Sequence, residues 1–165
     1  MATIEFTGID EYAAKLRALG KAGTSICRAA VYDGAGVVAD AIRQQIEGLA
    51  TIEDYEAIIA WRQEIPAHGI TQKQKEGLLD GMHLQKIRDE NGFICTEVGF
   101  SGYNTVQTRK FPGGQPNALI ARSMESGSSA RQKQPFIRPT VNQVKGAAET
   151  AMEVKINDMI NKIMD

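Results

Sequence analysis

The residues best suited to chemistry in this sequence are two histidines and two cysteines, and none of them stands in a pattern that defines a site. His68 and His83 are fifteen residues apart with no HExxH or CxxC motif beside them, so a metal site would need ligands from distant parts of the chain. Cys27 and Cys95 match no metal or redox spacing. The sequence therefore predicts two buried thiols in a reducing cytosol.

Three further stretches fall short of catalytic motifs. GFSG at residues 99–102 is one residue shorter than the Gly-x-Ser-x-Gly elbow, and no helix directly follows it. FPGGQP at residues 111–116 lacks Walker spacing and a following Lys-Ser/Thr. Glu53, Asp54 and Glu56 are more simply a solvated helix face than a pair of catalytic carboxylates. We therefore expect a protein without enzymatic activity, metal or cofactor.

Positive charge is concentrated in one part of the chain. The formal net charge is −1, yet residues 105–145 hold seven Lys or Arg against one acid, Glu125. A chain polarised in this way often meets a charged partner or stacks against copies of itself. The residues that we predict for a partner interface or a DNA path are Arg109, Lys110, Arg131, Lys133, Phe136 and Arg138.

The same segment leaves an alternative open. Tyr103, Phe111 and Phe136 are interleaved with the basic residues, and such a set can follow a phosphate backbone and stack bases. No recognised nucleic-acid motif accompanies them. Docking of protein, contact with nucleic acid and a merely solvated loop are the three interpretations.

The loop before the last helix, ESGSSARQKQPFIRP, has prolines at two decisive places. Pro135 and Pro139 restrict φ at both ends of Phe136-Ile137-Arg138, which stiffens this part of the loop. We expect Phe136 and Ile137 to anchor in the core and Arg138 to point outward. A stiff loop loses less entropy when a neighbour docks on it, which suits assembly.

Length, composition and periodicity predict how these residues are positioned. A chain of 165 residues with 42% hydrophobic and 24% charged residues fits one soluble globular domain. No apolar run reaches the roughly 18 residues that span a bilayer, and the first residues do not resemble an export signal, so we expect no membrane contact. Helical spacing predicts helices over 9–19 and over about 24–48, 51–66, 71–82, 117–126 and 140–164.

Short-range signals mark the ends of these helices. Gly20 is expected to end the first, and either Thr24 or Ser25 can cap the second. Thr71 and Gln74 form a capping-box pair, Gly127 closes the 117–126 helix, and Pro139 takes the first position of the last helix.

Strand signals are fewer than helix signals. Residues 3–7 alternate like a strand with one buried face, and Asn91-Gly92 is a strong turn signal between strands over 84–89 and 93–100. Gly34 and Gly36, inside the long helix, indicate close backbone packing, a kink or plain tolerance. The sequence therefore predicts an α+β domain, a small antiparallel sheet packed against two long helices, the second at the C-terminus.

The order of these parts resembles the phage tail-component family, which supplies tail-completion or head–tail joining proteins of long-tailed bacteriophages. Three motifs carry the resemblance: Glu76, Gly77 and Leu79 at the first, Glu125, Gly127 and Ser128 at the second, and Pro135 to Pro139, PFIRP, at the third. Residues 50–75 resemble a helical insertion in a single domain spanning 1–165. An aromatic residue usual before the second motif is absent, with residues 119–123 in its place.

The resemblance implies a structural, non-enzymatic virion protein. Such proteins form a ring at the head–tail joint or the tail end, usually with six-fold symmetry. The implied partners are further copies of the chain, a tail-tube or tail-terminator protein and head–tail connector proteins, with non-specific contact to passing DNA. The implied location is the neck or tail of the virion, assembled in the cytoplasm of a bacterial host.

Overall fold

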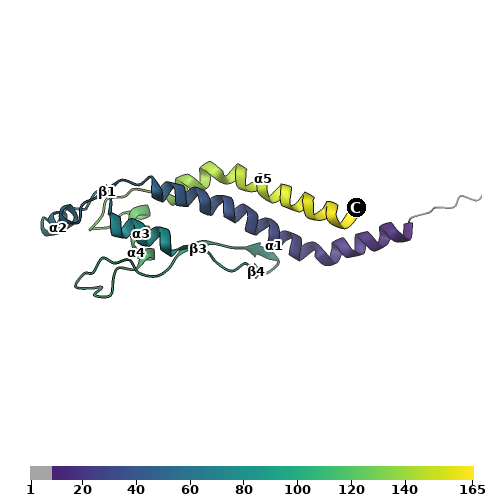
Figure 1. The fold of residues 1–165 in the computed structure, drawn as a ribbon, viewed down its shortest axis with the longest axis horizontal. Helices are drawn as coiled ribbons and strands as arrows, with labels where there is room; N and C mark the ends of the chain where they lie inside the picture. The colour runs from purple at the N-terminus through teal and green to yellow at the C-terminus, as the bar shows by residue number, and fades with distance from the viewer. Residues whose placement is uncertain (1–8) are drawn as a thin grey trace, which may run out of the picture.

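Two long helices form the body of the molecule. The computed structural model describes residues 9–165, so the strand predicted over 3–7 lies outside the described residues. Helix α1 (Ile9–Glu47) and helix α5 (Ile137–Met164) lie side by side and run in opposite directions (Figure 1). At 1.5 Å per residue, their 39 and 28 residues correspond to rods of about 58 and 42 Å. The molecule is therefore elongated, with a narrow two-helix end and a wider end.

The predicted break at Gly20 is wrong, because α1 continues through it. A glycine inside a helix costs only about 1 kcal/mol relative to alanine, which packing along the rest of α1 readily offsets. Thr24 and Ser25, the two candidate caps of a second helix, lie inside α1, and Ser25 donates its hydroxyl hydrogen to the carbonyl of Ala22 at 2.7 Å. One helix replaces the two that were predicted.

The two glycines of the long helix have different roles. A Cβ at Gly34 would lie 2.6 Å from Met152 Cγ and 3.2 Å from the Ala148 carbonyl, so Gly34 permits the close approach of α5. A Cβ at Gly36 would meet nothing within 4 Å. Close packing is thus confirmed at Gly34, whereas Gly36 is only tolerated.

The wide end holds the remaining elements. These are β1 (Thr51–Ile52), α2 (Asp54–Arg62), β2 (Ile70–Thr71), α3 (Gln72–Gly81), β3 (Met82–Leu84), β4 (Arg88–Glu90), β5 (Phe93–Cys95), β6 (Val98–Phe100) and α4 (Asn117–Ser126). The capping box predicted at the start of α3 is confirmed: the Thr71 side chain accepts from the backbone of Gln74, whose own side chain accepts from the Thr71 backbone. Strands β1 and β2, which pair in parallel, were not predicted.

The predicted hairpin is confirmed in its turn and interrupted in its strands. Asn91 and Gly92 both have positive φ, 57° and 88°, as a two-residue hairpin turn requires. Beside the turn, β4 pairs with β5; farther along, β3 pairs with β6. Between these pairs, residues 85–87 face only residues 96–97, so one extra residue bulges and separates the two short ladders.

The main core lies where the helices of the wide end meet α1 and the start of α5. Phe136, only 1% exposed, packs edge-to-face on Phe100 with ring centroids 6.3 Å apart. The other buried members of this cluster are Ile42, Ile46, Ile70, Leu78, Met82, Ile120, Ala121 and Met124. The α+β class, with a small antiparallel sheet and long N- and C-terminal helices, is confirmed.

The segment predicted as a helical insertion contains α2, flanked by β1 and β2. Helix α2 is shorter than the predicted 51–66 helix and ends before Pro66. Glu64 adopts φ 56°, and the amide of Ile65 donates to the carbonyl of Ala60, a reversal typical of helix C-termini. Whether residues 50–75 are an insertion relative to other proteins stays a prediction. Within residues 9–165, no helix is both long and apolar enough to cross a bilayer.

Candidate interaction surface

The residues predicted for an interface lie in two loops, which we call the elbow (residues 125–139) and the basic loop (residues 103–116). The elbow joins α4 to α5, and the basic loop joins β6 to α4. Both loops lie at the wide end of the molecule (Figure 1). Their backbone contacts decide which predicted side chains face solvent.

The elbow is organised by one carboxylate. Glu125 accepts the backbone N–H groups of Phe136 and Ile137 at 2.9 Å each and that of Arg138 at 3.1 Å. Residue 139, the next in this first turn, is proline and has no N–H to satisfy. All four amide positions at the start of α5 are thus accounted for without water.

This arrangement sets the protonation of Glu125. Burial acts to raise the pKa of this carboxyl, but the backbone N–H groups of residues 136–138 and the charge of Arg138 together outweigh burial. The pKa of Glu125 therefore lies below its ordinary value. A carboxylate at a helix N-terminus also interacts favourably with the helix dipole.

The conformation of Gly127 explains why the Glu-x-Gly motif has a glycine at this position. It adopts φ 78°, and its amide donates to the carbonyl of Ser123 at 2.9 Å, which closes α4 as predicted. A Cβ at this position would lie 3.2 Å from the Cβ of Lys133. Glycine at this position thus allows the chain to reverse direction and allows the segment around Lys133 to pack close to Gly127.

The predicted position of Pro139 is wrong by two residues. Helix α5 begins at Ile137, so Pro139 is its third residue. Proline is still accommodated there because the first turn of a helix lacks intrahelical partners for its N–H groups. The expectation that Phe136 and Ile137 anchor in the core while Arg138 points outward is confirmed. Phe136 is buried and Ile137 is partly buried against the core cluster, whereas the Arg138 side chain is 85% exposed.

Arg131, predicted on the same surface, instead points into the protein. Its guanidinium donates to the carbonyl of Gly69 and, at 2.9 Å, to Gln74 Oε1, and it lies 3.9 Å from Met124 Sδ. Burial lowers the pKa of Arg131 to about 10, so the side chain stays charged at neutral pH. Arg131 joins the elbow to α3, whereas Lys133 remains exposed.

The basic loop is fixed at its base and presents its charge at its tip. Asn104 donates its backbone N–H to the Gln115 carbonyl at 2.9 Å. At the tip, Thr108 and Phe111 exchange backbone hydrogen bonds of 3.0 and 3.1 Å, which makes Arg109 and Lys110 the central residues of a tight turn. Both side chains are exposed, and Lys110 Nζ lies 5.6 Å from the centre of the Phe111 ring.

Two glycines in α3 allow the basic loop to pack closely against this helix. A Cβ at Gly77 would lie 2.5 Å from Asn104 Cβ, and one at Gly81 would overlap the Ser101 carbonyl. Asn117, at the start of α4, donates from Nδ2 to that same carbonyl at 2.8 Å. Asn104 Nδ2 and Asn117 Oδ1 are buried here without a hydrogen-bond partner within the described chain. Gly77, in the first of the three motifs, is thus required by close packing.

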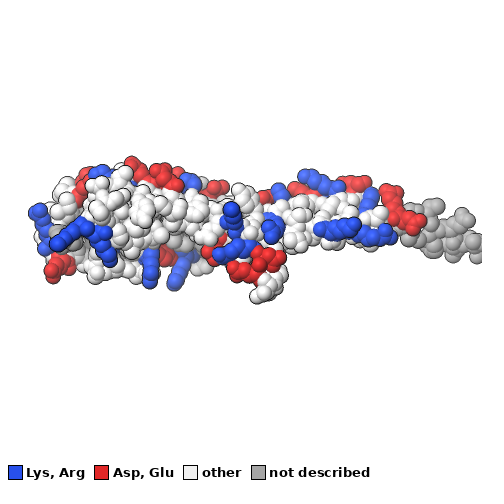
Figure 2. Space-filling view, turned by 90° about the horizontal axis from the view of Figure 1, so that it is seen from below, with Lys and Arg blue, Asp and Glu red and all other residues white. Residues whose placement is uncertain are grey.

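The charged side chains are distributed along the whole rod. Figure 2 shows Lys and Arg in separate groups at the wide end, near the middle and along the narrow end, with acidic groups between them. Of the residues predicted for the interface, those exposed are Arg109, Lys110, Lys133 and Arg138. These side chains belong to two loops, Arg109 and Lys110 to the basic loop and Lys133 and Arg138 to the elbow.

Ser101 and His83, which the sequence analysis considered separately, are neighbours in the structure. Ser101 Oγ lies 3.4 Å from His83 Nδ1, but the same nitrogen lies 3.0 Å from the carbonyl of Gly81. A nitrogen that donates to a carbonyl carries the proton and cannot accept one from serine. The pair is therefore not arranged as a nucleophile and its base. No cluster of three or more metal-ligating side chains occurs within residues 9–165. The prediction that both thiols are buried is wrong, because Cys27 is exposed and Cys95 is half-buried.

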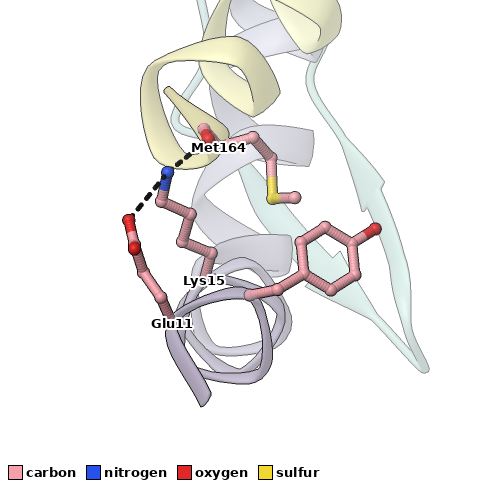
Figure 3. A pocket seen from close by; sticks show the side chains of 4 residues that line it. Glu11, Lys15 and Met164 are labelled. Atoms are coloured by element: carbon pink, nitrogen blue, oxygen red, sulfur yellow. Dashed lines mark hydrogen bonds and ion pairs between the residues drawn. The ribbon is translucent and has the colours of Figure 1, made fainter. Parts of the chain in front are cut away.

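A hollow at the narrow end also has a structural explanation. It is lined by Glu11, Tyr12, Lys15 and Met164 (Figure 3). Lys15 Nζ donates to the carbonyls of Met164 and Asp165 at 2.8 and 3.1 Å and lies 3.6 Å from Glu11 Oε1. A cation at the C-terminus of a helix satisfies its last carbonyls, so Lys15 fastens the end of α5 to α1.

Comparison of this chain with protein-family models, with curated proteins and with solved structures finds no match.

Proposed function

We propose that this protein is a structural component of a phage virion, a subunit of a homo-oligomeric ring at the head–tail joint or the tail end. The ring is six-fold in the form that the resemblance implies. It contacts a tail-tube or tail-terminator protein and head–tail connector proteins. The protein acts by assembly and not by catalysis.

The observation that carries this proposal is the contact between Glu125 and the start of α5. Two of the three motifs behind the resemblance, Glu-x-Gly and Pro-Phe-Ile-Arg-Pro, meet in this single contact. The result is a fixed elbow that presents Lys133 and Arg138 to solvent. A preorganised surface of this kind loses little entropy when a neighbour docks on it.

Native mass spectrometry of the purified protein, alone and mixed with tail-tube and connector proteins of the same phage, tests the proposal. We expect a discrete closed oligomer of this chain, either alone or in the mixture. A species that stays monomeric in every mixture would overturn the proposal.

A second candidate function, nucleic-acid binding, is favoured by the tip of the basic loop. Arg109 and Lys110 project from a tight turn, and Tyr103 is exposed at the base of the same loop. Titration of a DNA duplex at several salt concentrations tests this function. Affinity that falls steeply with salt supports it, because each neutralised phosphate releases a counterion. Absence of binding at low salt rejects it.

A further inference from the structure

Helix α2 exposes an apolar face that no other element among the described residues 9–165 covers. Tyr55, Ile58 and Ile59 lie on one side of the helix, at spacings of three and four residues, and are between 46% and 60% exposed. Ile65, just beyond the helix, is also more than half exposed. The helix stands at the extremity of the wide end, beyond β1 (Figure 1). Several large apolar side chains grouped in this way are typical of a protein–protein contact.

The surroundings of this face are acidic. Residues 53–65 contain four acids and one base, Arg62. Asp54 pairs with Lys73 of α3 at 2.7 Å, and both side chains are exposed. Glu53 and Glu64 are exposed on either side of the helix in the sequence. We call residues 53–65 the acidic patch.

A surface of opposite character lies at the same end of the molecule. Residues 103–122 contain three bases, Arg109, Lys110 and Arg122, and no acid. Tyr103 and Leu119 add exposed apolar area to this surface. We call residues 103–122 the basic patch. In a single chain both patches are exposed, so they do not cover one another.

We infer that the acidic patch of one copy docks on the basic patch of a second copy. The proposal rests on the proposed function and names the contact that would build the ring. Docking of α2 on another α2 would bring acid against acid, whereas docking on the basic patch matches opposite charges and covers apolar side chains on both partners. Such a contact joins two different surfaces, so it leads from copy to copy and closes into a ring when the rotation allows.

Paired charge reversals test the contact. One variant carries Glu53→Lys and Glu64→Lys, and the other carries Arg109→Glu and Lys110→Glu. None of these four side chains makes a hydrogen bond or ion pair within residues 9–165, so both variants should fold, which circular dichroism verifies. We expect each variant alone to lose assembly, with the dissociation constant raised about tenfold or more at physiological salt, measured by sedimentation velocity.

An equimolar mixture of the two variants gives the sharper result. If the contact is correct, every interface in an alternating ring of the two variants again pairs opposite charges, and the mixture regains the wild-type oligomer. The matched control for the first variant is Glu149→Lys with Glu153→Lys on the exposed side of α5, which changes the net charge by the same amount and in the same direction and should leave assembly intact.

The outcomes also separate this inference from the proposed function. If both variants still form the wild-type oligomer, or if their mixture does not form it, the proposed contact is overturned. Either result leaves the proposed ring itself unaffected. If the variant with Arg109→Glu and Lys110→Glu loses DNA binding but still assembles normally, the basic patch binds nucleic acid. That result also overturns the proposed contact. A wild-type protein that is monomeric in every mixture overturns both.

Discussion

Glu125 and Phe136 are eleven residues apart, and the carboxylate of the first accepts the backbone N–H of the second at 2.9 Å. The two neighbouring amides donate to the same carboxylate. This one side chain therefore satisfies the start of α5 and holds the elbow against α4, which is itself closed by Gly127.

Replacing Glu125 by glutamine should destabilise the protein. The variant keeps the shape of the side chain but loses the charge and one acceptor oxygen, so we expect unfolding to require about 1–3 kcal/mol less free energy. Urea denaturation measures the difference. Glu149→Gln, which removes only an exposed pair with Lys145 at 3.8 Å, is the matched control and should change stability by less than about 0.5 kcal/mol. Equal effects of the two variants would contradict the role of Glu125.

The contribution of Glu125 should depend on pH. Because the folded-state pKa of this carboxyl is lowered, its stabilisation is fully present above the unfolded-state pKa, about 4.3, and is lost as the pH falls through the folded-state value. The free-energy difference between wild type and Glu125→Gln should stay constant from pH 7 to about 5.5 and shrink in more acidic solution. Denaturation curves across this range check it. A difference that grows on acidification would have the wrong sign.

Gly77 and Gly36 should respond to alanine in opposite directions. At Gly77 the new methyl group would press on Asn104, so we expect a loss of about 2 kcal/mol or more through overpacking. At Gly36 the space is open, and alanine should stabilise α1 by up to about 1 kcal/mol. Melting temperatures of the two variants decide the matter. A harmless Gly77→Ala would mean that the basic loop is not held against α3.

Alanine substitutions of Arg131 and Lys133 should have different effects on stability, because Arg131 is partly buried and Lys133 is exposed. Arg131→Ala removes the hydrogen bonds to Gly69 and Gln74, and we expect a loss of stability of about 1–3 kcal/mol. Lys133→Ala alters an exposed side chain and should change stability by no more than about 0.5 kcal/mol. Thermal unfolding of both variants tests this ordering. Equal stability of the two variants would contradict the structural role of Arg131.

Local signals in the sequence predicted local structure well. Asn91-Gly92 and the Thr71–Gln74 capping box specify a turn and a helix start with a few neighbouring residues, and both are confirmed. Gly20 misled because the small penalty of one glycine is outweighed by packing against a helix more than one hundred residues away. Arg131 misled because burial of a long charged side chain depends on tertiary partners, here Gly69 and Gln74.

The contact of Glu125 with α5 was not predicted, although the sequence holds a signal for it. Glu125 is the only acid among the seven bases of residues 105–145, and Pro139 removes one amide from the start of the following helix. A lone carboxylate near a helix that lacks its own capping side chain is a candidate for that role. The spacing of eleven to thirteen residues hides it, because capping side chains usually lie within the same turn.

Electron microscopy of the purified protein tests the central claim, assembly into a ring, most directly. Negatively stained particles, prepared alone and with the tail-tube and connector proteins of the same phage, should show closed rings whose class averages have a defined rotational symmetry. Images that contain only single elongated molecules in all of these preparations would contradict the account.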